Sequence, residues 1–116
     1  MKISRKLYIL FIGWMVLLTI LSLIPRTGVD LGERWDKAAH FIAYFFTALL
    51  FYVSFRTRFK KTDIYAVLFA FCYGALIELV QCIVPHRVGS FKDLAANFSG
   101  ILFFFVLYRV LWGRYD

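Results

Sequence analysis

The chain has 116 residues, of which 62% are hydrophobic, 21% are aromatic and 18% are charged. Soluble domains are about 45–50% apolar, and a soluble domain of this length has too little interior to hide so many apolar side chains. The composition therefore excludes an ordinary cytosolic enzyme, a disordered tail and a disulfide-linked secreted module. The net charge of +7 comes from basic residues placed between apolar runs, which indicates contact with anionic lipid head groups rather than nucleic acid.

Four apolar runs follow one another along the chain, each long enough to cross a bilayer as a helix. They cover residues 7–24, 38–55, 64–84 and 94–112. About 20 helical residues span the hydrocarbon core, and none of the runs alternates apolar and polar residues as a barrel strand does. The sequence therefore predicts an all-α integral membrane protein, with one membrane domain over residues 1–116 and four transmembrane helices.

Lys and Arg are distributed unevenly between the segments that flank these runs. Nine of the 14 basic residues lie before the first run, between the second and third runs, or at the end of the fourth, and the other five lie in the remaining loops. Because cytoplasmic segments of membrane proteins carry an excess of Lys and Arg, this distribution predicts that both termini lie in the cytoplasm. The loops formed by residues 25–37 and 85–93 are then predicted to lie outside.

Polar residues within the apolar runs are expensive in a membrane, so their positions carry information. Three groups each share one face of a predicted helix: Asp36, His40 and Tyr44 in the second, Glu78 and Gln81 in the third, and Asp93, Asn97 and Gly100 in the fourth. In the predicted orientation all three groups lie near the outer boundary of the membrane and can converge there. At the opposite end we expect basic loops and aromatic residues, but no comparable group of inward polar residues.

Glu78 gives the sharpest indication of a site, because it lies roughly 10 Å inside the end of its apolar run. A carboxylate at that depth needs a cation, a proton or a water-filled cavity. Lys37, His40 and Arg87 are the cations available to it. A purely structural ion pair between Glu78 and Arg87 is an alternative, and helix capping or helix packing is the structural alternative for the other groups.

The same residues form an ordered pattern: Asp36–Lys37–Ala–Ala–His40–Phe41–Ile–Ala–Tyr44, then Glu78–Leu–Val–Gln81, then Pro85–His–Arg87, then Ser90–Phe–Lys–Asp93–Leu–Ala–Ala–Asn97–Phe–Ser–Gly100. The pattern, which extends roughly from Pro25 to Tyr108, resembles the VanZ-like family of small bacterial membrane proteins. One departure is Phe104, which stands where family members often carry a second glycine.

The resemblance implies a four-helix protein of the bacterial cytoplasmic membrane that contacts membrane lipids. The name-giving member of the family is associated with reduced susceptibility to teicoplanin, a glycopeptide that carries a lipid tail, although the family has no firmly assigned biochemical activity. We therefore expect the chain to bind or act on a lipid-linked or cell-envelope substrate on the extracytoplasmic side, with glycopeptide susceptibility as one cellular consequence.

The residues expected to form the site fall into two groups. Those with acid–base chemistry are the catalytic candidates: Glu78, His40, Asp93 and Asp36. Those that would bind or orient a substrate are Lys37, Tyr44, Gln81, Arg87 and Asn97. Arg87 suits phosphate, because a planar guanidinium donates two parallel hydrogen bonds. Phosphoryl or glycosyl transfer on a lipid of the polyprenyl phosphate type would use this set of groups.

Two other interpretations stay open on the sequence alone. The chain can be a non-enzymatic scaffold or accessory subunit whose polar residues hold three helices in register, in which case a second copy or another membrane protein is the expected partner. The other interpretation is a divalent metal held by His40, Glu78, Asp93 and Asp36. The chain contains no HExxH motif and no paired Cys and His spacing, so this signal is weak and no cofactor is expected.

Overall fold

The computed structural model describes residues 5–23, 33–56, 60–83 and 91–111. They form four helices: α1 (Arg5–Leu23), α2 (Glu33–Phe55), α3 (Thr62–Gln81) and α4 (Phe91–Leu111). Each helix contains a window long and apolar enough to cross a membrane, since 19 to 23 helical residues extend about 30 Å. The predicted all-α fold with four membrane-spanning helices is confirmed.

The helices begin earlier than the apolar runs that predict them. We expected α2 to begin at residue 38 and α4 at residue 94, whereas they begin at Glu33 and Phe91. Residues 33–37 contain neither proline nor glycine, so nothing in the backbone prevents the helix from continuing past the apolar run. Hydropathy reports which residues suit the hydrocarbon core, and a polar first turn is invisible to it.

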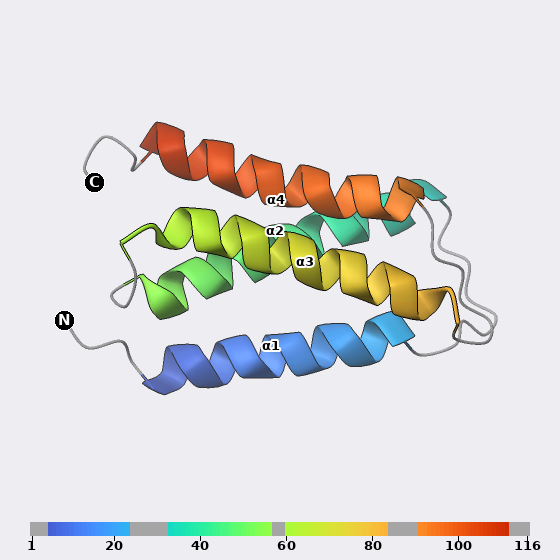
Figure 1. Cartoon of the computed structure of the whole chain (residues 1–116), viewed down its shortest axis with the longest axis horizontal. Coiled ribbons are helices and arrows are strands. Elements are labelled where there is room, and N and C mark those ends of the chain that lie inside the picture. The colour runs from blue at the N-terminus through green and yellow to red at the C-terminus, as the bar shows by residue number, and fades with distance from the viewer. Residues whose placement is uncertain (1–4, 24–32, 57–59, 84–90, 112–116) are drawn as a thin grey trace.

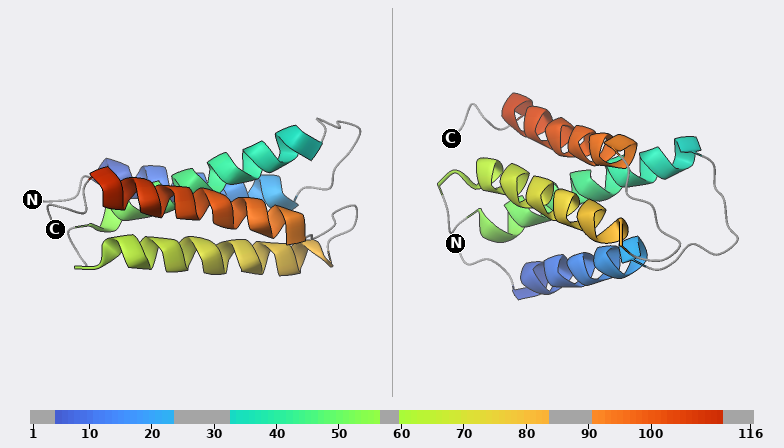
Figure 2. Two further views of the ribbon diagram at one scale, coloured as in Figure 1. Left: turned by 90° about the horizontal axis from the view of Figure 1, so that it is seen from above. Right: turned by 45° about the vertical axis from the view of Figure 1, so that its right-hand side comes forward.

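The four helices lie roughly along the longest axis of the molecule. Helices α1, α3 and α4 form one row, and α2 lies behind that row (Figure 1). Helix α2 is tilted relative to the other three (Figure 2), and it contacts all of them, most extensively α4. Helix α1 contacts α2 and α3 only, within the described residues, and has just two buried side chains, Phe11 and Ser22. The start of α2, the end of α3 and the start of α4 therefore meet at one end of the bundle.

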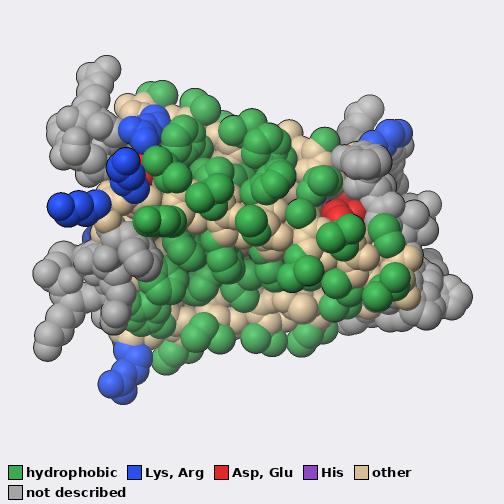
Figure 3. Space-filling model, viewed as in Figure 1, with side chains coloured by type: hydrophobic (Ala, Val, Ile, Leu, Met, Phe, Trp, Pro, Cys, Tyr) green, Lys and Arg blue, Asp and Glu red, His purple; other side chains and the backbone are tan. Residues whose placement is uncertain are grey.

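The outer surface of the bundle is apolar between two charged ends. Basic side chains gather mainly at the end where α1 begins and α4 ends, while the flank between the ends is covered by hydrophobic side chains (Figure 3). Leu79 and Val110, for example, are 69% and 64% exposed. Aliphatic side chains this exposed along every helix need a lipid surround rather than water, so the chain is a multi-pass membrane protein.

The buried core lies between α2, α3 and α4 and combines aromatic with small side chains. Tyr44, Ile101 and Phe104 are buried against alanines of α2 and α3. At Gly100 the backbones of α4 and α2 touch, because a Cβ there would overlap the carbonyl oxygen of Phe41 and lie 2.9 Å from its carbonyl carbon. This crossing brings the first turns of α2 and α4 against each other.

Candidate polar site at one end of the bundle

The first turns of α2 and α4 are joined by an ion pair. The Lys37 ammonium donates a hydrogen bond to Oδ1 of Asp93. The two side chains are only 28% and 12% exposed, so the pair lies at the edge of the bundle and partly out of solvent. Charges in that position attract each other more strongly than charges at a fully exposed surface.

His40 lies one turn deeper than Lys37 and contacts two residues of α4. Its Nδ1 is 2.9 Å from Oδ1 of Asn97, which accepts the hydrogen bond, and its Nε2 is 3.8 Å from Oδ2 of Asp93. An acceptor on one ring nitrogen fixes the orientation of the imidazole and leaves the other nitrogen facing a carboxylate. The i, i+4 spacing of Asp93 and Asn97 on α4 and the i, i+3 spacing of Lys37 and His40 on α2 thus produce one network.

Helix α3 packs against this network on the side that faces the interior of the bundle. Tyr44 is 2% exposed, and its ring lies so close to Gly74 that a Cβ there would be 3.0 Å from Cε2 of the tyrosine and 3.6 Å from Nδ2 of Asn97. Glu78 lies one turn beyond Gly74, is 7% exposed, and is close enough to Tyr44 to interact with it electrostatically. Glycine at position 74 therefore lets a tyrosine and an amide approach the helix that carries the buried carboxyl group.

One donor of the network lacks an acceptor. Nδ2 of Asn97 is buried, and it has no hydrogen-bond partner among the residues that the structure describes. Leaving a buried amide N–H unsatisfied costs about 1–3 kcal/mol, so such a group is typical of a place where a ligand or an ordered water supplies the acceptor. The amide is 1% exposed and lies between α2 and α3.

Gln81 does not join the network around His40. Its Nε2 donates a hydrogen bond to the backbone carbonyl of Ser22 at 2.7 Å, and the side chain is 3% exposed. It therefore ties the end of α3 to the end of α1. Its Oε1 is also buried without a hydrogen-bond partner in the described part of the chain. Gln81 therefore borders the site and can still accept one hydrogen bond.

Two predicted site residues cannot be placed beside these. Arg87 lies outside the described residues, and of Asp36 only the backbone, in the first turn of α2, is described. The metal interpretation needed Asp36 together with His40, Glu78 and Asp93. Within the described side chains no group of three or more His, Cys, Asp or Glu residues is arranged to hold a metal ion.

We expected no comparable group of inward polar residues at the opposite end, and the structure shows one buried carboxyl group there. Asp63, at the start of α3, is 7% exposed, and its Oδ2 lies 3.0 Å from a guanidinium nitrogen of Arg109 near the end of α4. Arg109 also lies 5.2 Å above the ring of Phe105. In the sequence, Asp63 lies just before the third apolar run and Arg109 lies near the end of the fourth. The sequence contained a signal for this pair, because Asp63 borders the third apolar run and Arg109 interrupts the fourth.

Comparison with known proteins places the chain in a family but gives no activity. It is 27% identical over 99 residues to an uncharacterized protein of Schizosaccharomyces pombe, a match that covers 84% of this chain and 59% of the relative. The chain thus spans about three fifths of the length of that relative. No solved structure matches it. A family model described as VanZ/LLP1 matches residues 5–112, nearly the whole chain. The chain therefore belongs to the VanZ/LLP1 family.

Proposed function

We propose that this protein binds a lipid-linked substrate of the polyprenyl phosphate type at the polar end of the bundle and acts on its phosphate. The observation that carries the proposal is the meeting of three helices around a buried amide donor. Nδ2 of Asn97 is buried with no acceptor among the described residues, beside the imidazole of His40 and close to the helix of Glu78. A phosphate oxygen is the kind of acceptor such a donor binds well.

The charges around this donor suit a phosphate that enters from the membrane surface. Lys37 remains 28% exposed while it contacts Asp93, so its ammonium can reach a head group without leaving the site. Arg87, which follows α3 in the sequence, would add a guanidinium able to bind two phosphate oxygens at once. Asp93, and Asp36 at the start of α2, would orient these cations.

The acid–base groups suit transfer at a phosphate. His40 is held by Asn97 on one nitrogen and faces Asp93 with the other, so it can carry a proton to or from a bound substrate. With a polyprenyl diphosphate, water would attack the terminal phosphorus, the bond from that phosphorus to the bridging oxygen would break, and inorganic phosphate and polyprenyl phosphate would leave. Glu78 is buried nearby and would take the proton of the attacking water or protonate the leaving oxygen. Tyr44, buried between them, would position the reacting group.

The biological setting is part of the proposal. The excess of basic residues at the opposite end favours an extracytoplasmic site, and resemblance to a family named for teicoplanin resistance favours a substrate of the bacterial cell envelope, with altered glycopeptide susceptibility as a consequence. The matching yeast protein comes from an organism without peptidoglycan. A phosphate-bearing polyprenyl lipid is chemistry that both kinds of membrane contain, so we place recognition at the lipid phosphate rather than at a glycopeptide.

One observation supports a non-enzymatic scaffold instead. Lys37 with Asp93 and His40 with Asn97 both join α2 directly to α4, so the same side chains also hold two helices in register. In that case the protein would act by binding another membrane protein or a second copy of itself, and the polar residues would matter for accumulation rather than for turnover.

The experiment that distinguishes an enzyme from a scaffold compares one buried carboxyl group at each end of the bundle. Glu78 and Asp63 are each 7% exposed, which makes Asp63→Asn a matched control for Glu78→Gln. Each variant is expressed, its abundance in the membrane is measured, and the purified protein in nanodiscs is incubated with a polyprenyl diphosphate whose consumption is followed by mass spectrometry. We expect Glu78→Gln to accumulate and to lose turnover by about 100-fold or more, the range of general acid–base catalysis.

Asp63→Asn should keep its turnover per folded molecule, because Asp63 pairs with Arg109 far from the substrate. Equal losses of turnover in both variants, or a Glu78→Gln protein that fails to accumulate while Asp63→Asn accumulates, would favour the scaffold. Absence of turnover by the unmodified protein would overturn the enzymatic proposal.

A further inference from the structure

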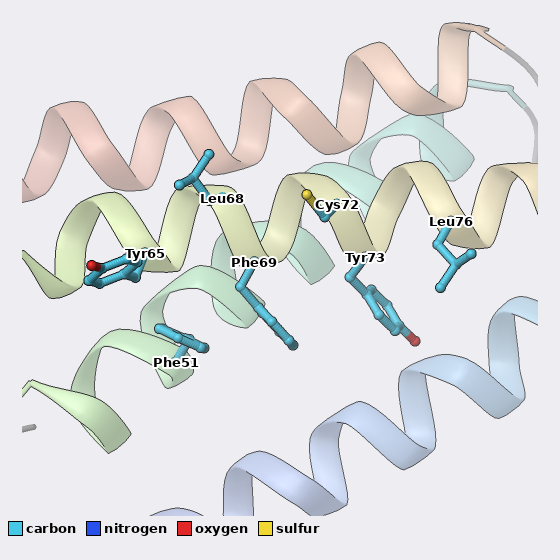
Figure 4. A pocket seen from close by; sticks show the side chains of 7 residues that line it. All are labelled: Phe51, Tyr65, Leu68, Phe69, Cys72, Tyr73 and Leu76. Atoms are coloured by element: carbon cyan, nitrogen blue, oxygen red, sulfur yellow. The ribbon is translucent and has the colours of Figure 1, made fainter. Parts of the chain in front are cut away.

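An apolar groove runs along the outer side of α3 and reaches α2 (Figure 4). Its volume is about 680 Å³, and its walls are formed by one residue of α2 and six of α3: Phe51, Tyr65, Leu68, Phe69, Cys72, Tyr73 and Leu76. Figure 4 shows Phe69 and Tyr73 projecting from α3 toward α1, with Phe51 beside them from α2. The volume falls in the usual range for sites that hold small organic ligands.

Aromatic rings form one wall of the groove and continue it into the core. Phe51 and Phe69 stack with centroids 5.0 Å apart, and Phe69 and Tyr73 are nearly parallel at 6.3 Å. Tyr73 in turn lies 6.2 Å from the ring of Tyr44, the tyrosine buried under the polar site. The groove and the polar site are therefore connected through two tyrosines in contact.

The groove persists because α1 packs loosely against α3. Two hydrogen bonds join these helices: the Tyr73 hydroxyl bonds to Thr19, and Gln81 donates to the carbonyl of Ser22. Both lie toward the polar end of α3. Nearer the start of α3, Phe11 of α1 packs against the rings of Phe51 and Phe69, with centroids 5.9 and 5.7 Å apart, and this contact limits the groove on the side of α1.

We propose that this groove holds the isoprenoid tail of the lipid whose phosphate occupies the polar site, an inference that rests on the proposed function. The groove lies along a helix that is long and apolar enough to span a membrane, and its lining is almost wholly apolar. Such a lining suits a hydrocarbon and not a polar peptide. It follows one helix as a single slot, which suits the one chain of a polyprenyl phosphate better than the two chains of a phospholipid. Leu76 ends the groove on the exposed side of α3, and the contact of Tyr73 with Tyr44 joins the groove to the interior side of the helix, which carries Glu78.

The first test uses a polyprenyl phosphate that carries a diazirine in its tail. The probe is bound to the purified protein in nanodiscs, cross-linked by light and mapped by peptide mass spectrometry. We expect labelling at Leu68, Cys72 and Leu76 that unlabelled polyprenyl phosphate displaces. Labelling spread evenly over lipid-facing residues of all four helices, or displaced equally well by phosphatidylcholine, would overturn the proposal.

A second test fills the groove. Leu76 lines the groove and is 57% exposed, whereas Val106 of α4 does not line it and is 56% exposed. Leu76→Trp should weaken the binding of a long-chain polyprenyl phosphate about tenfold, and Val106→Trp should leave it unchanged. Binding of a short-chain analogue with the same phosphate should be unchanged in both.

The outcomes separate this inference from the proposed function. If polyprenyl phosphate binds with a clear preference for the phosphate but neither labels the groove nor responds to Leu76→Trp, the tail lies elsewhere and only the groove proposal fails. If the unmodified protein does not distinguish polyprenyl phosphate from polyprenol, the proposed function fails as well.

Discussion

At the scale of single residues, polar side chains of α2 form hydrogen bonds and ion pairs with polar side chains of α4. His40 contacts Asn97 and Asp93, and Lys37 contacts Asp93. Spacing along the sequence predicted which residues share a face of a helix and that these faces meet at one end of the bundle. It could not predict that Gln81 turns to Ser22 of α1, because periodicity fixes a face of one helix but not which neighbour covers that face.

The pair of Lys37 and Asp93 should stabilise the bundle. Asp93 is 12% exposed at its side chain, so Asp93→Asn removes a negative charge that the Lys37 ammonium contacts in a partly dehydrated place. A double-mutant cycle with Lys37→Met should give a coupling free energy of about 1–3 kcal/mol, measured from unfolding in bicelles by steric trapping. Additive effects of the two substitutions would show that the pair is not formed in the membrane.

At the scale of helices, Gly100 sets the distance between α2 and α4. A Cβ there would lie 2.9 Å from the carbonyl carbon and 3.2 Å from Cα of Phe41, both backbone atoms that no rotamer change can move. Four residues later Phe104 is buried and lies 6.3 Å from the ring of Phe45, so the packing there uses an aromatic ring instead of a second glycine. Sequence spacing grouped Gly100 with Asp93 and Asn97 on one helix face and left helix packing as an alternative role, and the structure shows that packing.

Gly100→Ala should therefore force the two helices apart. We expect it to lower the free energy of unfolding by about 3 kcal/mol or more and to weaken the contacts between His40 and Asn97. Gly13 is the control, because nothing lies within 4 Å of a Cβ built there. Gly13→Ala should be neutral or stabilise α1 by up to about 1 kcal/mol. Equal effects of the two substitutions on thermal unfolding would contradict the close crossing.

At the scale of the whole molecule, charge and apolar surface determine how the bundle sits in a membrane. The four apolar runs predicted the four helices, since only helices and closed barrels satisfy their backbone groups in lipid and the runs lack the alternation of barrel strands. The apolar runs could not reveal that the buried Asp63 pairs with the half-exposed Arg109, because which residues of α3 and α4 face each other depends on the rotation of each helix in the bundle.

The basic residues predict an orientation with both termini in the cytoplasm, and fusions to the C-terminus test it directly. A C-terminal fusion to green fluorescent protein should fluoresce, and the matching fusion to alkaline phosphatase should be inactive, because nine of the 14 basic residues lie on the side that carries the termini. Active phosphatase at the C-terminus would place the polar site on the cytoplasmic face and would move the substrate to the inner leaflet.

The account as a whole depends on recognition of a lipid phosphate by the polar end of the bundle. The most direct measurement is native mass spectrometry of the unmodified protein with a long-chain polyprenyl phosphate and with the polyprenol of equal length. We predict that the phosphate lipid binds at least about tenfold more tightly than the alcohol, since the two differ only in the group that Asn97, Lys37 and His40 would contact. Equal affinity for the two lipids would contradict the account.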